Sequence, residues 1–323
     1  MANNHQSNYS YNNHYNSRKN RYAKKQIFMR VALYMIMLIM LSIIGVLAVF
    51  SINQHRAAQV LEKELDSLES RLEKVEQDNT DLEEKYEEIH EKNQELLEEN
   101  EKLREENKMM RSETIIEHGS RETNKVAITI DDGGAESLTH RALDYFKEYN
   151  VQATLFPKGD IVEQQPEVWQ RAVDEGHELG NHTYTHPYLS YQSNEKIKEE
   201  LKNWQKAVDQ SLEQDYRTLF FRPPYRDGYS SGQRWHKERI QEIVAEQGMF
   251  TILWDIETLH ALQNNPYTTE NITRHVLNNA QGGSIILLHF IDEDIAAIPD
   301  IITGLRDRGL EPVPLSEVLL AES

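Results

Sequence analysis

Residues 126–134 read Val-Ala-Ile-Thr-Ile-Asp-Asp-Gly-Gly, an apolar, β-branched run that ends in two adjacent carboxylates and two glycines. Val, Ile and Thr favour strands, so this run predicts a strand over Val126–Ile130. Asp131 and Asp132 then follow at the carboxyl end of the strand, where burial without a partner would be costly. The glycines permit a tight turn that brings the backbone close to a ligand. Taken alone, an acidic Asp-Gly surface turn is the simpler interpretation.

Strand-like and helix-like runs alternate through the rest of residues 121–323. Further strands are expected over Val151–Phe156, His177–Asn181, Thr218–Arg222, Phe250–Asp255, Ser284–Phe290 and Glu311–Val313. Helices are expected over Ser137–Tyr149, Pro166–Asp174, Glu195–Gln214, Arg234–Ala245, Thr269–Asn278 and Ala296–Arg308. The alternation predicts an α/β fold with parallel strands. Its period fits a barrel and an open sheet equally well, and in both the reactive residues collect at the carboxyl ends of strands.

Two histidines four residues apart follow the strand expected at His177–Asn181. One helical turn of backbone would place the imidazoles of His182 and His186 on the same face. The chain has 13 histidines, so a lone pair of this spacing is weak evidence. Together with Asp132, however, the pair makes a two-histidine, one-carboxylate set. Such a set binds a divalent metal and leaves positions open for water and substrate.

Two more polar motifs end later strands. Arg222-Pro223-Pro224-Tyr225 follows the fourth expected strand, and its tandem prolines would hold Arg222 and the Tyr225 amide in fixed directions. A rigid structural turn explains this motif equally well by itself. His289 ends the apolar run Ile285–Leu288. Such a histidine usually belongs to the core, but beside the other polar groups it fits a general acid.

In this order and spacing, the motifs resemble those of the NodB-homology polysaccharide deacetylases, carbohydrate esterase family 4. The resemblance covers residues 121–323, and its motifs are jointly specific. It implies a distorted (β/α) barrel with fewer than eight complete units. It also implies metal-dependent hydrolysis of N-acetyl groups on polysaccharide. Zn²⁺ is the expected ion, with Co²⁺, Ni²⁺ and Mn²⁺ as alternatives.

The resemblance implies a role for each motif residue. Asp131 corresponds to the general base, Arg222 to the residue that orients it, and His289 to the general acid. The backbone amide of Tyr225 would help to hold the oxyanion. The implied metal ligands are Asp132, His182 and His186. The implied substrate-binding residues are Tyr225, Leu287, which would meet the acetyl methyl group, and Trp254.

The fourth motif departs from the family pattern, in which a Trp is followed six residues later by an Asp-Trp pair. Here Trp254 is followed at that distance by His260 and Ala261. His260 therefore stands where the family has the aspartate that tunes the catalytic histidine. Glu257 or Asp255 could take over this role. The departure bears on His289 and on the shape of the sugar cleft, not on metal binding.

The N-terminal part predicts a membrane anchor. Residues 1–26 are rich in Asn and Tyr and predict a disordered tail; the first 53 residues hold six basic and no acidic residues. Val31–Phe50 has no charge and is long enough to span a hydrocarbon core of about 30 Å. A buried soluble helix or a cleaved signal peptide would be shorter or less uniformly apolar. We expect an uncleaved anchor over residues 27–53, with the N-terminus cytoplasmic and the remainder outside the cell membrane.

Residues 54–113 contain no Gly or Pro and carry a heptad repeat. With Leu65 at position a, apolar or Asn residues fill the a and d positions of seven consecutive heptads, which end at Met110. This seam predicts a coiled-coil stalk, because a solitary solvated helix has no reason to keep such a repeat in phase. Asn at the a positions 79, 93, 100 and 107 favours a parallel homodimer in fixed register.

Charge and cysteine content exclude further classes of function. The chain has 35 basic and 54 acidic residues, a net charge of −19, of which residues 114–323 hold 19 and 34. Such an acidic part argues against nucleic-acid binding. The absence of cysteine excludes disulfides, thiolate zinc sites and cysteine nucleophiles.

The leading hypothesis is therefore a membrane-anchored deacetylase, a hydrolase of carbon–nitrogen bonds, whose catalytic domain spans residues 114–323. Its expected substrate is N-acetylated cell-envelope glycan, first of all the GlcNAc or MurNAc of peptidoglycan. One alternative is a non-catalytic glycan-binding or scaffold protein assembled through the coiled coil. Another is an O-acetyl esterase with the same site.

Overall fold

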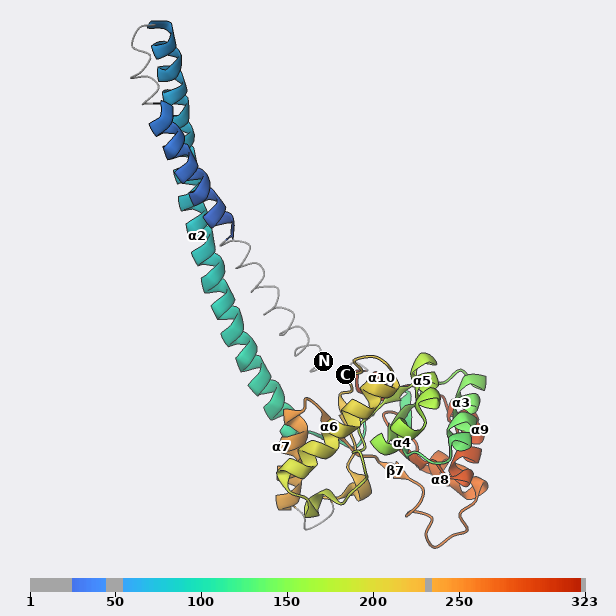
Figure 1. Cartoon of the computed structure of the whole chain (residues 1–323). Helices are drawn as coiled ribbons and strands as arrows, with labels where there is room; N and C mark the ends of the chain where they lie inside the picture. The colour runs from blue at the N-terminus through green and yellow to red at the C-terminus, as the bar shows by residue number, and fades with distance from the viewer. Residues whose placement is uncertain (1–24, 45–54, 230–233, 321–323) are drawn as a thin grey trace. The chain divides into compact units, whose positions relative to one another are not determined.

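The computed structural model describes residues 25–44, 55–229 and 234–320 (Figure 1). Residues 1–24 of the tail expected over residues 1–26, and residues 45–53 of the expected anchor, lie outside the described residues. The last two residues of the expected tail, Lys25 and Gln26, are helical, because they begin the apolar helix. Contacts divide the chain into two compact units, one ending at Arg104 and the other beginning at Glu105. Each unit is described by itself.

The N-terminal unit contains two helical segments. Lys25–Ile44 is a helix of 20 residues with a mean hydropathy of 2.4 and no buried residue. Among the described residues it is the one helix that is long and apolar enough to cross a membrane, by length and composition alone. The helix α2, His55–Glu113, runs for 59 residues, as expected from its lack of Gly and Pro.

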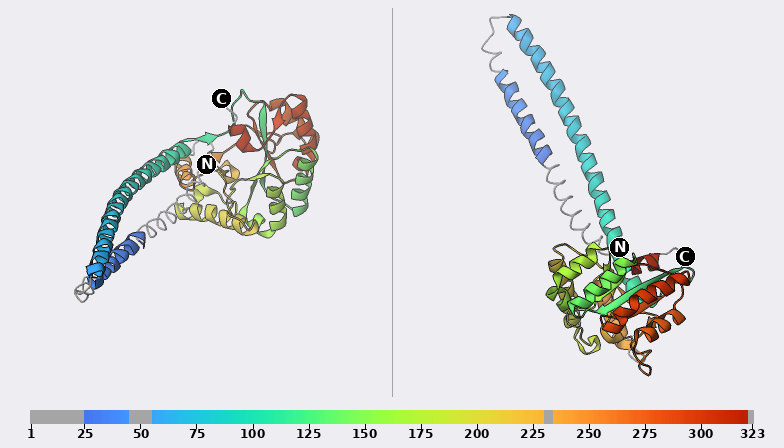
Figure 2. Two further views of the ribbon diagram at one scale, coloured as in Figure 1. Left: turned by 90° about the horizontal axis from the view of Figure 1, so that it is seen from above. Right: turned by 90° about the vertical axis from the view of Figure 1, so that its right-hand side faces the viewer.

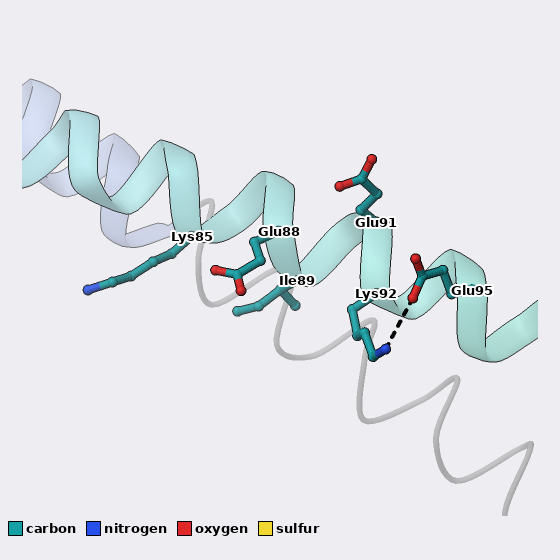
Figure 3. A pocket seen from close by; sticks show the side chains of 6 residues that line it. All are labelled: Lys85, Glu88, Ile89, Glu91, Lys92 and Glu95. Atoms are coloured by element: carbon teal, nitrogen blue, oxygen red, sulfur yellow. Dashed lines mark hydrogen bonds and ion pairs between the residues drawn. The ribbon is translucent and has the colours of Figure 1, made fainter.

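Several positions of the predicted seam on α2 are exposed in the single chain. Ile89 and Leu96, both at d positions, are 46% and 44% exposed. Figure 3 shows a shallow pocket on this stretch, where Ile89 lies among charged side chains and Lys92 pairs with Glu95 at 3.1 Å. Such exposed ion pairs contribute little to stability. The continuous helix is confirmed, while the homodimer remains a prediction.

The second unit is built on two sheets whose paired strands are all parallel. The larger sheet has the order β4-β3-β2-β8-β7, with β9 also paired to β2. Its strands are β2 (Lys125–Asp132), β3 (Thr154–Pro157), β4 (Glu178–Leu179), β7 (Ile256–Glu257), β8 (Ile285–His289) and β9 (Glu311–Pro312). The smaller sheet has the order β1-β6-β5, made of β1 (Ile115–Ile116), β5 (Phe220–Phe221) and β6 (Phe250–Ile252).

The two sheets join into a distorted barrel. On one side, the backbone N–H of Asn181 donates to the carbonyl of Phe220 at 2.8 Å, and Arg222 N–H donates to the carbonyl of Asn181 at 2.9 Å. These bonds connect the end of β4 with β5. On the other side the chain runs directly from β6 into β7 through residues 253–255. The circuit of parallel strands is thereby closed, which confirms the expected fold class.

Helices surround the strands (Figures 1 and 2). They are α3 (Glu136–Glu148), α4 (Gly159–Gln164), α5 (Pro166–Asp174), α6 (Asn194–Ser211), α7 (Arg234–Glu246), α8 (Thr269–Asn279), α9 (Asp292–Asp307) and α10 (Leu315–Leu320). Two short 3₁₀ turns, η1 (Leu189–Tyr191) and η2 (Pro224–Arg226), lie between them. Ile128 and Ile130 of β2 are fully buried in the same apolar cluster as residues of α3 and α9. Alternation along β2 then turns Thr129 and Asp131 to the opposite face.

Most expected elements are present within a few residues of their predicted ends. The strand expected over Phe250–Asp255 is instead two strands, β6 and β7. The break between them lies at residues 253–255, where the side-chain carboxylate of Asp255 accepts hydrogen bonds from Ile285 N–H at 2.7 Å and Ser284 Oγ at 2.9 Å. The strand β1 was not expected, because a two-residue run such as Ile115–Ile116 is too short to show a strand periodicity.

Candidate active site

Asp131 and Arg222 form a buried ion pair at the carboxyl end of β2. Arg222 Nη1 donates to Asp131 Oδ1 at 2.7 Å, and the two residues are 0% and 3% exposed. The same Nη1 reaches Thr129 Oγ1 at 2.8 Å, and Nη2 reaches the carbonyl of Leu253 at 3.2 Å. Burial lowers the pKa of Arg222, although the Asp131 carboxylate opposes that shift. Losing either partner would leave an uncompensated buried charge. The hydrogen bond from Arg222 also holds the Asp131 carboxylate in one orientation.

The two expected histidines lie on a tight turn after β4. Thr183 and His186 have φ values of 65° and 62°, a left-handed conformation that non-glycine residues rarely adopt. His182 is 2% exposed, and its Nδ1 lies 2.8 Å from the carbonyl oxygen of Arg222. The tautomer that donates this hydrogen bond leaves Nε2 free to act as a ligand. Strain of this kind is concentrated at functional sites.

Asp132 faces both histidines. Its Oδ1 lies 3.0 Å from Nε2 of His186 and 3.6 Å from Nε2 of His182. Burial by itself would raise the pKa of Asp132, but hydrogen bonding and charge from the two imidazoles lower it well below its usual range. Burial likewise opposes the charged form of His182, yet the carboxylates of Asp131 and Asp132 raise its pKa. The site thus favours positive charge.

The donor atoms of this triad fit a divalent metal. The ligand atoms of Asp132, His182 and His186 all lie within 4.8 Å of one another. Two imidazole nitrogens and one carboxylate oxygen match the ligand preference of Zn²⁺ and leave further positions open, as a catalytic site requires. The structure therefore brings together the three ligands expected from the sequence.

Glu200 holds the histidine turn in place, and the sequence analysis missed it. This residue of α6 is 2% exposed. Its Oε2 accepts hydrogen bonds from the N–H groups of Tyr184 and Thr185 at 3.1 and 2.8 Å, and its Oε1 accepts one from Thr185 Oγ1 at 2.9 Å. The sequence contains a signal for this role: Glu200 lies on the same helix face as the apolar Ile197 and Trp204, and a carboxylate buried there needs hydrogen-bond partners.

His289 ends β8 beside Asp131. The two residues are register partners on neighbouring parallel strands, which run about 4.8 Å apart. Leu287, 2% exposed, points to the same face two residues earlier. His289 and Leu287 therefore lie on the same face of the sheet as Asp131, and their expected roles as general acid and acetyl-binding residue stay predictions.

Asp294 is a second residue that sequence reasoning missed. It is fully buried at the start of α9, and its Oδ2 accepts a hydrogen bond from His289 N–H at 2.8 Å. The same oxygen lies 3.9 Å from Nδ1 of His289. Its Oδ1 accepts a hydrogen bond from Tyr267 at 2.6 Å and a longer one from Thr258 at 3.3 Å. Burial raises the pKa of Asp294, and these donors oppose the shift.

The two carboxylates suggested as partners of His289 are engaged elsewhere. Asp255 binds Ile285 N–H and pairs with Arg121 at 2.8 Å, at the opposite end of β8. Glu257 Oε1 lies 3.0 Å from Nδ1 of His260, whose side chain is 78% exposed. Among the described residues, the carboxylate placed against His289 is that of Asp294.

Tyr225 and Trp254 flank this arrangement. Tyr225 has a φ of 59°, and its ring centroid lies 4.4 Å from that of His186. The guanidinium groups of Arg222 and Arg226 each lie 5.6 Å from the centroid of Trp254. Apart from Leu287 in the middle of β8, the site residues expected from the sequence motifs come from strand ends or from the turns that follow them.

Comparison with known proteins identifies the family. Residues 118–249 match the family model described as polysaccharide deacetylase. A peptidoglycan-N-acetylglucosamine deacetylase of Bacillus cereus is 33% identical over 60% of this chain and 87% of its own length. A peptidoglycan-N-acetylmuramic acid deacetylase of Bacillus subtilis is 31% identical over 59% of this chain and 70% of its own length. The chain belongs to the polysaccharide deacetylase family.

Solved structures give the same result. A peptidoglycan N-acetylglucosamine deacetylase in complex with a hydroxamate-type benzamide superposes with a TM-score of 0.55 and 28% identity, over 64% of this chain and 92% of that chain. A mutant of a CE4-family pseudoenzyme with restored enzymatic activity superposes with a TM-score of 0.56 and 26% identity, over 64% of this chain and 71% of that chain. Both similarities are to the barrel architecture described above.

Proposed function

We propose that this protein is a metal-dependent N-deacetylase of cell-envelope polysaccharide, with the GlcNAc or MurNAc of peptidoglycan as its substrate. The observation that carries the proposal is the juxtaposition of two groups. Asp131, fixed by Arg222 at 2.7 Å, is the chain neighbour of Asp132, which faces His182 and His186. A binding protein has no need for a buried base beside such a triad. The peptidoglycan deacetylases among the relatives support the choice of substrate.

Asp132, His182 and His186 would hold the metal, for which we propose Zn²⁺, with Co²⁺, Ni²⁺ and Mn²⁺ as alternatives. When bound, a divalent cation supplies Lewis-acid chemistry: it polarises the acetamide carbonyl and makes water more acidic. The carbonyl of Arg222 fixes the ring of His182 through Nδ1, so that Nε2 faces the site.

Asp131 is the proposed general base. Its Oδ1 is occupied by Arg222, so Oδ2 is the oxygen that would take the proton of the attacking water. Arg222 is fixed by its own bonds and cannot swing away, which keeps the base within reach of the carbonyl carbon. The backbone N–H of Tyr225 would donate a hydrogen bond to the oxyanion that forms.

His289 is the proposed general acid. It would protonate the nitrogen of the leaving amino sugar as the C–N bond breaks, because an amide nitrogen leaves poorly as an anion. Asp294 would act as a positioning residue: it accepts a hydrogen bond from the backbone N–H of His289 and lies beside the ring. Leu287 and Trp254 would bind the substrate beside these groups. The products are acetate and a free amino group on the sugar.

The N-terminal part would place this chemistry at the cell wall. We propose that residues 27–53 anchor the chain in the cell membrane, with the N-terminus cytoplasmic. The apolar helix Lys25–Ile44 supports this topology. Residues 54–113 would form a parallel homodimeric stalk, and the catalytic domain of residues 114–323 would stand outside the membrane, within reach of wall glycan.

A non-catalytic function is the second candidate. The altered fourth motif at His260 and Ala261 and the similarity to a solved CE4-family pseudoenzyme mutant both motivate it. The complete set of Asp131, the triad and His289 weighs against it.

Acetate release from peptidoglycan and from N-acetylated chitooligosaccharides tests the proposal. The full chain in detergent should release acetate, lose activity with a chelator and regain it with Zn²⁺ or Co²⁺. His182→Ala and Asp131→Asn should lower the rate by at least about 10³-fold. The control is His140→Ala, an exposed histidine bonded to Arg171 on the outer helices. Unchanged activity in His182→Ala would refute the catalytic assignment, and acetate from O-acetylated substrates alone would replace it with an esterase.

A further inference from the structure

Three tyrosines make a row of exposed aromatic rings beside the metal triad. Tyr225, Tyr188 and Tyr191 are 54%, 49% and 83% exposed. The rings of Tyr225 and Tyr188 stack with centroids 4.1 Å apart, and Tyr188 meets Tyr191 edge-on at 6.0 Å. We call these three residues the tyrosine platform. None of the three contributes to a core cluster, so packing does not explain their presence.

The backbone under the platform is held rigidly. Ser190 of η1 lies between Tyr188 and Tyr191 in the sequence, and its N–H donates to the buried carboxylate of Asp227 at 2.6 Å. Arg239 of α7 donates to the carbonyls of Leu189, Ser190 and Gln192 at 3.2, 3.3 and 2.7 Å. The Asp227 carboxylate and the Arg239 guanidinium thus fix the backbone of this loop, while the rings of Tyr188 and Tyr191 remain exposed to solvent. Preorganised rings of this kind lose little entropy on binding a ligand.

The platform is continuous with the candidate active site. Tyr225 lies 4.4 Å from His186, and Tyr188 is the second residue after that ligand. A chain molecule with one unit at the metal triad would therefore pass over the stacked Tyr225–Tyr188 pair before it reaches Tyr191.

The chemistry of the platform favours an uncharged sugar polymer. Aromatic faces carry partial negative charge and attract the polarised C–H groups on the flat face of a pyranose ring. The surrounding residues 114–323, with 19 basic and 34 acidic side chains, disfavour an anionic polymer such as nucleic acid. A protein partner or a second copy of this chain would be the other occupant of an exposed aromatic patch, and the test below separates these cases.

We propose that Tyr225, Tyr188 and Tyr191 form a binding subsite for the sugar rings of the glycan strand that flank the ring being deacetylated. The inference rests on the proposed function, since it takes the active-site sugar as its reference point. It adds a dependence on chain length: longer N-acetylated glycans gain contacts that short ones cannot reach.

Tyr191→Ala is the decisive variant. Tyr191 is the member of the platform at the end away from the triad, and its ring contacts Tyr188. Binding is measured in the full chain carrying Asp131→Asn, which prevents turnover, with N-acetylated five-sugar and two-sugar chitooligosaccharides as probes. We expect the Kd for the five-sugar probe to rise about tenfold, and that for the two-sugar probe by much less. Tyr191→Phe, which keeps the ring, should restore most of the affinity.

Met109→Ala is the matched control, since Met109 is an apolar residue of α2 with 61% exposure outside the platform. It should leave both Kd values as they are. Equal affinity of Tyr191→Ala and its parent for the five-sugar probe would overturn the subsite. So would an equal loss for both probes, or a loss of self-association with no change in glycan binding. Failure of the proposed function would look different: the chain with Asp131 intact would release no acetate although binding still depended on Tyr191.

Discussion

The carboxylate of Asp294 contacts His289 in two ways: Oδ2 accepts a hydrogen bond from the backbone N–H at 2.8 Å and lies 3.9 Å from Nδ1 of the ring. Asp294 thereby occupies, from helix α9, the side of the histidine for which the sequence offered only Asp255 or Glu257. A buried carboxylate beside an imidazole restricts the position of the ring. The pairing supports the proposed role of His289 in a chain whose fourth motif is altered.

Asp294→Asn should lower kcat by about 10- to 100-fold with little change in KM, because the His289 ring loses the carboxylate that lies beside it. Metal content should stay at the parent level. A fall in kcat at unchanged KM is the readout that separates a positioning role from simple damage to the fold.

Asp255→Asn is the matched control for this variant. Asp255 caps the other end of β8, where Oδ1 accepts from Ile285 N–H at 2.7 Å, and it pairs with Arg121. Its loss should cost stability but leave kcat and KM of the folded enzyme near the parent values. An equal fall in kcat in both variants would contradict the role given to Asp294.

Glu200→Gln should loosen the histidine turn. The carboxylate accepts three hydrogen bonds from Tyr184 and Thr185, and an amide can accept at only one of its two ends. We expect a loss of about 1–3 kcal/mol in the free energy of unfolding and a Zn²⁺ affinity about tenfold weaker. Denaturant titration and competition with a metal chelator measure the two effects. Glu199→Gln, a change at the exposed neighbour that pairs with Lys196, is the control and should have little effect on either.

The sequence predicted those site residues that belong to short motifs at the ends of strands. Asp132, His182 and His186 could be linked because each follows a strand, and strand ends gather at one rim of an α/β barrel. The barrel itself came from the resemblance, since hydrophobic periodicity does not distinguish a closed circuit of strands from an open one. On one side the circuit closes through the two backbone hydrogen bonds at Asn181. Such bonds cannot be read from the amino-acid sequence.

The roles of Asp294 and Glu200 depend on tertiary contacts. The sequence placed Asp294 in a loop before a helix expected from Ala296, whereas α9 begins at Asp292 and turns the side chain inward. Glu200 is one of three glutamates in α6; its spacing from Ile197 and Trp204 marks it as inward-facing, but its partners on the histidine turn are set by tertiary packing. Strand lengths were overestimated for a similar reason: β4 and β5 are cut short by the turns that carry the functional residues.

His177 should make stability depend on pH. It is 4% exposed, its Nδ1 accepts a hydrogen bond from Ala153 N–H at 3.0 Å, and burial lowers its pKa from 6.5 to about 4. Between those values the unfolded chain binds a proton that the folded chain does not. Stability therefore falls as the pH drops through this window, by up to about 3 kcal/mol from this group.

His177→Gln keeps a hydrogen-bond acceptor and removes the titration. Urea unfolding at about pH 7 and about pH 4.5 should show a smaller pH-dependent loss of stability in this variant than in the parent. Equal losses in both proteins would assign the acid sensitivity to other groups.

Helix α2 should pair in parallel and in register through its seam. The chain has no cysteine, so single cysteines report the pairing without background. Asn100→Cys, at an a position, should form an intermolecular disulfide in the full chain, because facing a positions bring their Cα atoms within disulfide range. An antiparallel pair would place this residue opposite the other end of the seam and would not cross-link it. Glu98→Cys, on the outer face two residues away, is the matched control and should cross-link far more slowly. Equal cross-linking of the two positions would contradict the seam, and a monomer in sedimentation at high concentration would contradict the dimer itself.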